Sequence, residues 1–340
     1  MLIKLSKVLL LLCAATTIAY AGAPGNNMVP PSGVALIAPS TPGMWTVGLE
    51  ATMLMPIDKF QYMQAVLPQP DGSTIFHNES VDNQPGFGWG VNVGYQFANT
   101  GRDITVAFMT DNTGDSEAYS VPVGTILYGP NGRSNPLQIT DGGNAVGTAD
   151  YRYRAADLTM GQLFTIGQRV TLHPFAGLRY AYLSVDGDAS YNHLSGEVDQ
   201  FDSDSIFNGA GPRIGVNAAV HLWWGFSIVG TAGASVLIGD ISDPYKVIAN
   251  AQNSAITTTT KYDSDDNTTV IPELDESLGL DYQYAFAPTT ILDAQFGVQM
   301  LNYFNGDQHD FVSTVDTNSS LAEQDFGLHG LYLRAQMSFA

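Results

Sequence analysis

Hydrophobic and polar residues alternate with a period of two in ten separate segments of this chain. The clearest segment is 86–98, where glycine, asparagine and glutamine alternate with six apolar residues, namely Phe87, Trp89, Val91, Val93, Tyr95 and Phe97. Such alternation is typical of a β-strand whose two faces meet different surroundings. The predicted strands cover residues 44–55, 86–98, 104–108, 150–166, 170–185, 205–224, 226–239, 270–286, 290–304 and 326–340.

The apolar face of these strands is long and aromatic, whereas the opposite face is small or polar. This contrast predicts that the outer face meets lipid. Short turns alternate with long loops, which are expected at 57–85, 112–149, 186–204, 240–269 and 305–325. An open sheet would leave unpaired backbone groups in hydrocarbon, so the first and last strands are expected to pair. The expected fold class is therefore all-β: a transmembrane antiparallel β-barrel of about ten strands, with short periplasmic turns and long extracellular loops.

A soluble β-sandwich is the alternative fold. It is disfavoured because the outward face of a sandwich strand should be polar rather than aromatic.

The N-terminus predicts export from the cytoplasm. Lys4 and Lys7 precede the apolar run VLLLLCAA, and Ala19-Tyr20-Ala21 has the small residues of a secretory cleavage site. The apolar run is too short for a membrane-spanning helix. We therefore expect a signal peptide at 1–21, a periplasmic lead-in at 22–42 and the barrel at 43–340, located in the cell outer membrane.

Composition narrows the classes of function. The net charge of −20 makes the chain a poor binder of nucleic acid. Its single cysteine, Cys13, lies in the predicted signal peptide, which excludes disulfides and thiol chemistry in the mature chain. No motif joins the six histidines to a nucleophile, and no metal or cofactor site is predicted. We expect no enzymatic activity, and an outer-membrane lipid-modifying enzyme is the least favoured alternative.

The candidate chemistry is a set of charged residues on the inward face. Counting from the periplasmic end places Asp157, Arg179 and Arg213 at nearly equal height on three consecutive strands, where they can form one ion cluster. Glu50 and Arg334 share a height on the first and last strands, which are neighbours only in a closed barrel. Two aspartates low on the eighth and ninth strands add negative charge near the periplasmic mouth. The predicted pore-lining residues are Glu50, Asp157, Arg179, Arg213, Asp281, Asp293 and Arg334.

Five segments resemble a known family. They are GLRYAYL (177–183), FNGAGPRIG (207–215), LGLDYQYAF (278–286), LNYFN (301–305) and GLYLRAQMSF (330–339). In these patches the chain is similar to the Legionella-type major outer-membrane protein family. The resemblance implies a surface-exposed, pore-forming barrel.

Two interpretations of the interior charges stay open. Eight strands make a barrel that side chains just fill, and about 16 leave an open channel, so ten strands is an ambiguous size. We favour a narrow, partly plugged pore, because many inward positions are glycine or small polar residues. The alternative is a non-conducting surface adhesin or structural protein of the outer membrane.

The expected partners follow from this placement. They are outer-membrane lipid and lipopolysaccharide, small ions or solutes in the lumen, and a host or surface ligand at the long loops, with no nucleic acid. Arg152 and Arg154 have outward parity just above the expected membrane edge. A guanidinium at that height can bind lipopolysaccharide phosphates.

Overall fold

The computed structural model describes residues 43–340 except 70, 72, 129–135, 138–141, 168, 251–256, 263–266, 288 and 312–319. The chain divides into two units, Met1–Ala35 and Leu36–Ala340, and every described residue belongs to the second. The predicted signal peptide (1–21) and lead-in (22–42) lie outside the described residues. No helix in the described ranges is long and apolar enough to cross a membrane.

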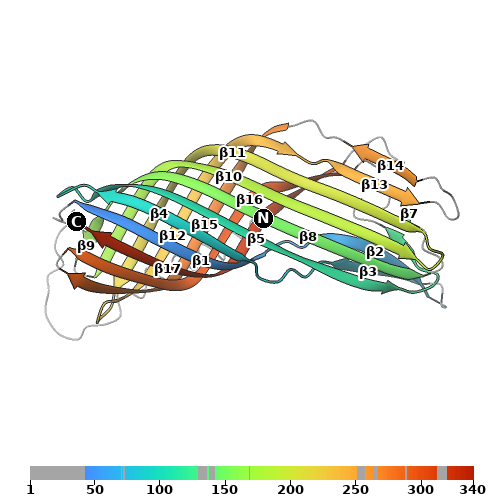
Figure 1. Ribbon diagram of the computed structural model, residues 1–340, viewed down its shortest axis with the longest axis horizontal. Helices are drawn as coiled ribbons and strands as arrows, with labels where there is room; N and C mark the ends of the chain where they lie inside the picture. Colours follow the sequence, from blue (N-terminus) through green and yellow to red (C-terminus); the bar gives the residue numbers. More distant parts are fainter. Residues whose placement is uncertain are drawn as a thin grey trace. The chain divides into compact units, whose positions relative to one another are not determined.

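Ten antiparallel strands form a closed ring (Figure 1). The ring closes because β1 pairs with β17, from Trp45 opposite Phe339 to Pro56 opposite Leu328. The predicted ten-stranded antiparallel barrel is therefore confirmed. In ring order the strands are β1 (Met44–Pro56), β4 (Phe87–Gln96), β5 (Arg102–Val121), β8 (Gly143–Gln162), β10 (Val170–His193), β11 (Val198–His221), β12 (Phe226–Ser242), β15 (Asn267–Ala287), β16 (Thr290–Phe311) and β17 (Ser320–Phe339).

Seven shorter strands accompany the ring within the described ranges. Four of them, β2 (Gln61–Pro68), β3 (Thr74–Ser80), β6 (Ile126–Tyr128) and β7 (Pro136–Leu137), form a separate sheet. The strand β9 (Phe164–Ile166) pairs with the start of β10. On the extracellular side, β13 (Tyr245–Asn250) pairs with β11 and with β14 (Thr257–Tyr262).

The barrel strands run well beyond their predicted extracellular ends. The segment 186–204, expected as a loop, is mostly the continuation of β10 and β11, and much of 112–149 belongs to β5 and β8. The prediction of long loops at these two places was therefore wrong in extent. The reason is that the alternation of side chains continues above the membrane, but there the polar residues face outward and the apolar residues face inward.

This reversal is clearest on β8. In its lower part, Leu158 and Met160 are exposed on the outer face. In its upper part the exposed residues are polar and include Arg152 and Arg154, while Tyr153 between them is buried. A barrel strand has an apolar outer face only where that face meets lipid. The reversal therefore marks the outer edge of the hydrocarbon layer.

Above that edge the interior of the barrel is apolar and packed. The chain leading into β2 enters the lumen, so that Phe60 and Tyr62 lie on the inward face of β10 and β8. A Cβ at Gly187 would lie 2.5 Å from the Phe60 ring, and one at Gly147 would lie 2.3 Å from the Tyr62 ring. The hydroxyl of Tyr191 donates to the Tyr62 carbonyl at 2.5 Å. Glycine is thus required at these two positions by the close approach of the β2–β3 hairpin.

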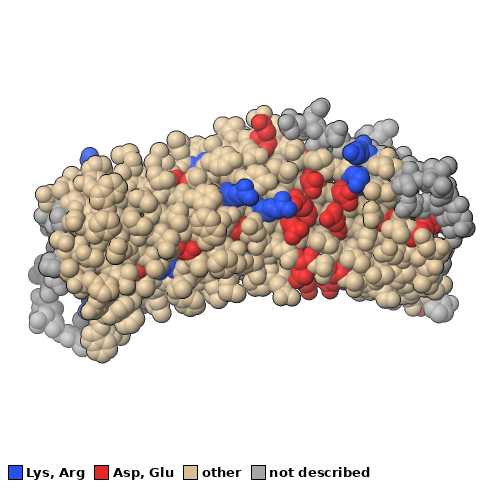
Figure 2. All heavy atoms as spheres, viewed as in Figure 1, with Lys and Arg blue, Asp and Glu red and all other residues tan. Residues whose placement is uncertain are grey.

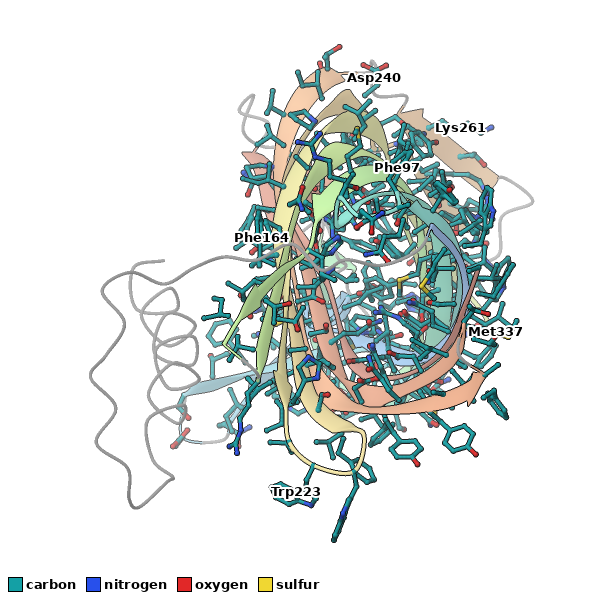
Figure 3. The ribbon with its side chains drawn as sticks, turned by 90° about the vertical axis from the view of Figure 1, so that its left-hand side faces the viewer. Phe97, Phe164, Trp223, Asp240, Lys261 and Met337 are labelled. Atoms are coloured by element: carbon teal, nitrogen blue, oxygen red, sulfur yellow. The ribbon has the colours of Figure 1, made fainter. Side chains whose placement is uncertain are left out.

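Side chains project into the ring along its length. Figure 3 views the barrel from its periplasmic end, where Trp223 projects from the turn between β11 and β12, and side chains occupy the space inside the strands. A buried hydrophobic cluster joins the inserted hairpin to the inward faces of nine barrel strands. Its fully buried large side chains include Leu54, Tyr62, Met63, Leu127, Tyr153, Leu183, Tyr191, Phe207, Tyr303 and Phe326.

Candidate functional site

A cluster of charged side chains crosses the lumen at the membrane edge. Arg179 on β10 faces Asp157, its register partner on β8. The Nε and Nη2 atoms of Arg179 donate to the two Asp157 carboxylate oxygens at 2.7 and 2.6 Å. Its Nη1 atom reaches across the lumen to Glu273 on β15, 2.5 Å from Oε1. Arg179 thereby links β8 and β15, which are not neighbours in the ring.

A second arginine completes the cluster. Arg213 on β11 donates from Nη1 and Nη2 to the two oxygens of Asp275 on β15, at 2.5 and 2.8 Å. The strand β12 lies between β11 and β15 in the ring, and it presents Gly233 at this height. A Cβ on Gly233 would lie 2.8 Å from the Arg213 guanidinium and 2.6 Å from the Asp275 carboxylate. The missing side chain allows the ion pair to form across β12.

The five charged side chains of Asp157, Arg179, Arg213, Glu273 and Asp275 are named the waist cluster here. The two arginine side chains are only 7% and 5% exposed, and the Glu273 side chain is fully buried. Burying charges is costly unless each is paired and hydrogen bonded. The multiple contacts of each arginine meet that condition, so the waist cluster is a rigid, mutually dependent unit.

An aromatic layer lies directly above the waist cluster. The hydroxyl of Tyr303 on β16 donates to the hydroxyl of Tyr153 on β8 at 3.2 Å, across the lumen. The Tyr303 ring also contacts Phe326 on β17, with ring centroids 6.3 Å apart. All three side chains are buried. This layer lies between the waist cluster and the buried hydrophobic cluster of the upper lumen.

Two cavities lie on either side of this layer. The lower cavity, of about 240 Å³, is lined by Asn92, His173 and Asn217 and by the waist cluster arginines. The upper cavity, of about 160 Å³, is lined by residues that include Asp58 of the inserted segment and Phe326. The two share no lining residue among the described residues. The two cavities thus lie at different levels of the barrel interior.

The predicted pore-lining residues fall into three groups. Asp157, Arg179 and Arg213 lie together in the waist cluster. Glu50 and Arg334 face each other on β1 and β17, joined by a bond of 2.7 Å from Nε, and line the lower cavity. Asp281 and Asp293 lie apart from both, nearer the periplasmic end on β15 and β16. There Asp293 accepts hydrogen bonds from Gln283 at 3.0 Å and Gln295 at 3.1 Å.

Sequence reasoning missed the two carboxylates that β15 adds to the waist cluster. Glu273 and Asp275 have the same inward parity as Asp281, which the sequence analysis did place in the lumen. That parity was the available signal. Parity alone could not show that Arg213 reaches Asp275 across Gly233, because that contact depends on the curvature of the ring.

The histidines of the lower lumen are held by polar neighbours. The Nε2 atom of His173 lies 2.5 Å from an oxygen of Asp103, and Nδ1 lies 3.2 Å from the Asn217 amide. His221 lies 2.8 Å from the Thr171 hydroxyl and 2.9 Å from the Ser227 hydroxyl. Ser227 is only 1% exposed. This hydroxyl is therefore closed to an incoming substrate.

A patch of aspartates lies on the outer face above the membrane edge. Asp186 is opposite Asp204, and Asp188 is opposite Asp202, on β10 and β11. Figure 2 shows acidic side chains gathered on this face, bordered by basic ones. Burial, with repulsion from Asp202, Asp204 and Asp186, raises the pKa of Asp188 to about 6. The nearby cations are Arg152, bound to Asp186 at 2.8 Å, and Lys246, bound to Asp202 at 2.9 Å.

The raised pKa of Asp188 predicts that the Asp188→Asn substitution stabilises the folded barrel in a pH-dependent way. A carboxyl whose pKa is raised on folding destabilises the fold above that pKa, and the penalty vanishes once pH falls below the unfolded value. The variant is expected to unfold at a higher temperature than the wild type at pH 8, with no gain at pH 3.5. The measurement is the temperature at which the compact gel band converts to the unfolded band. Asp240→Asn, on the outer face beside Thr268, is the control, and an equal gain at both pH values would contradict the prediction.

The fold and the interior define a transmembrane β-barrel of the outer membrane with a charged cluster crossing its lumen. The chain belongs to the family described as the Legionella pneumophila major outer membrane protein precursor, whose model matches residues 37–339. The predicted family and the predicted location in the outer membrane are thereby confirmed. Comparison with curated proteins finds no match.

Several solved outer-membrane structures are similar over most of the chain. The outer membrane protease OmpT from Escherichia coli is 10% identical with a TM-score of 0.39, covering 91% of this chain and 99% of that one. A Pseudomonas aeruginosa FadL homologue is 6% identical with a TM-score of 0.26, covering 88% and 90%. The P. putida toluene transporter TodX is 8% identical with a TM-score of 0.25, also covering 88% and 90%.

Proposed function

We propose that this protein presents its extracellular half at the cell surface on a barrel whose narrow pore is closed at rest. The observation that carries the proposal is that the waist cluster and the Tyr153–Tyr303 layer bridge the lumen at successive levels. Ions crossing this level would have to displace buried salt bridges that are hydrogen bonded on several sides, which is costly. The apolar packing around the inserted hairpin adds a second barrier above it.

The charge and burial pattern of the extracellular half also supports surface presentation. There the barrel is polar outside and apolar inside, like a soluble protein. Such a rigid support suits binding of a host or surface ligand by the connecting segments. Under this proposal the protein has no enzymatic activity, no cofactor and no nucleic-acid partner. The burial of Ser227 beside His221 supports this, because a nucleophile must be reached by its substrate.

A planar-bilayer recording of the purified, folded wild type tests the proposal. The expected result is no steady current at moderate voltage, although the gel band shows a folded barrel. The variant Tyr153→Ala with Tyr303→Ala removes the aromatic layer and is expected to give brief openings. A steady, ohmic conductance of the wild type would overturn the closed resting state.

The second candidate is a standing ion pore. The lower cavity favours it, because that cavity is lined by charged and amide side chains such as Glu50, Asn92 and Arg334. Water-filled lumens of outer-membrane barrels are polar in the same way. Steady wild-type conductance in the same recording would favour this candidate.

A further inference from the structure

Two arginines stand on the outer face of β8 at the membrane edge. Arg152 and Arg154 are two residues apart, and both are exposed. The Arg152 side chain, 46% exposed, is paired with Asp186. Arg154 lies opposite Tyr182 on β10, with its guanidinium carbon 5.5 Å from the centre of that ring. Arg154 has no ion pair with any residue that the structure describes.

Arg154 shares its lack of an ion pair with Arg102, Arg169 and Lys261 among the described residues, but Arg154 is the one placed at the membrane edge. The interior arginines Arg179, Arg213 and Arg334 are each paired with carboxylates, and the surface pairs Lys59–Asp82 and Lys246–Asp202 follow the same pattern. An exposed guanidinium held over an aromatic ring keeps its fork of donors free for an anion. The face that carries it borders the lipid, so the anion must be one present at the membrane surface.

The height of these arginines identifies that anion. Immediately below them, Leu158, Leu178 and Tyr180 are exposed toward lipid. The Tyr180 hydroxyl donates to Asn208 at 2.9 Å, as expected for a tyrosine at an interface. Immediately above them lies the aspartate patch that begins with Asp186. Phosphates repelled by that patch and excluded from hydrocarbon have one favourable level on this face, which is the level of Arg152 and Arg154.

We propose that Arg152, Arg154 and Tyr182 bind the phosphorylated headgroup of a glycolipid of the outer leaflet. The guanidinium groups donate to the phosphate oxygens, and planar arginine forks suit bidentate contacts of this kind. The acyl chains lie on the apolar strip formed by Leu158, Leu178 and Tyr180. The bound lipid attaches to the outer face of β8 and β10, so the site is independent of the lumen.

Retention of diphosphoryl lipid A by the purified barrel tests this site. Folded wild type and variants are mixed with lipid A in detergent, and bound lipid is counted by native mass spectrometry. Arg154→Ala is the cleanest variant, because it breaks no ion pair among the described residues. We expect about a tenfold loss of affinity, as for removal of one charge-assisted hydrogen-bonding group. Arg154→Lys is expected to retain part of the binding.

The control variant is Arg102→Ala. Arg102 is also exposed and lies at the periplasmic end of β5, and its side chain bonds only to Gln162 among the described residues, at 3.2 Å. It should leave lipid A retention unchanged. Dephosphorylated lipid A should fail to compete. Equal retention by Arg154→Ala and wild type, both shown to be folded by their gel bands, would overturn the proposal. Competition by inorganic phosphate as strong as that by lipid A would also overturn it and assign the site to a free anion.

Discussion

Arg179→Ala is expected to lower the free energy of unfolding of the barrel by about 3–5 kcal/mol, the typical cost of removing one partner of a buried ion pair. The guanidinium contacts both Asp157 and Glu273. Its loss leaves two carboxylates that are almost shielded from water without their main counter-charge. The free-energy penalty of a buried carboxylate without a partner is larger than the stabilisation that the ion pair provided.

Urea titration of the folded gel band would measure this effect. Arg334→Ala is the matched control, since it also removes an interior arginine from a carboxylate. The Arg334 side chain is 29% exposed, so water from the lower cavity can solvate Glu50 after the change, and a smaller loss is expected. Combining Arg179→Ala with Glu273→Gln should recover part of the stability. If Arg179→Ala costs no more than Arg334→Ala, the waist cluster is not the rigid unit described above.

Gly147→Val is expected to expel the β2–β3 hairpin from the lumen. The new Cβ would lie 2.3 Å from the Tyr62 ring, which is fully buried and cannot turn away because its neighbours are packed. Overpacking of this kind costs about 1–3 kcal/mol. That cost should raise the population of the displaced hairpin by roughly fivefold to 150-fold. The barrel strands themselves, paired along their whole length, should stay folded.

Chymotrypsin treatment of intact cells would detect the displaced hairpin. Cleavage after Phe60 or Tyr62 should be slow in the wild type and fast in the variant. Thr148→Val places the same side chain on the neighbouring, outward position of β8 and should leave the cleavage rate unchanged. Equal protection of Gly147→Val and wild type would contradict the placement of the hairpin inside the lumen.

The membrane-spanning half of the fold could be predicted from local pattern. A period of two places Leu158 and Met160 on one face of β8 and Asp157 on the other, whatever the rest of the chain does. Turn lengths then set the relative heights of Asp157, Arg179 and Arg213 on adjacent strands. The pairing of Glu50 with Arg334 followed from closure of the barrel. A sheet that crosses a lipid bilayer must close, because unpaired backbone groups are costly in hydrocarbon.

The extracellular half could not be predicted in the same way. Along 143–153 and 186–192 the alternation persists, but small residues such as Ala145, Ala149 and Gly187 weaken it. The sequence also does not determine which face of these strands is covered by another part of the chain. The hairpin that covers the inward face comes from residues 60–80, and its contact between Tyr62 and Gly147 joins positions far apart in the chain.

By itself, then, the amino-acid sequence determined the membrane-spanning part of the ten barrel strands, their faces in lipid and the closure of the ring. The tertiary structure alone decided what fills the lumen: the inserted hairpin, the Tyr153–Tyr303 layer and the contributions of Glu273 and Asp275. The physical reason is the range of the interactions. Strand alternation and turns depend on neighbouring residues, whereas packing across a barrel interior depends on the tilt and curvature of all ten strands together.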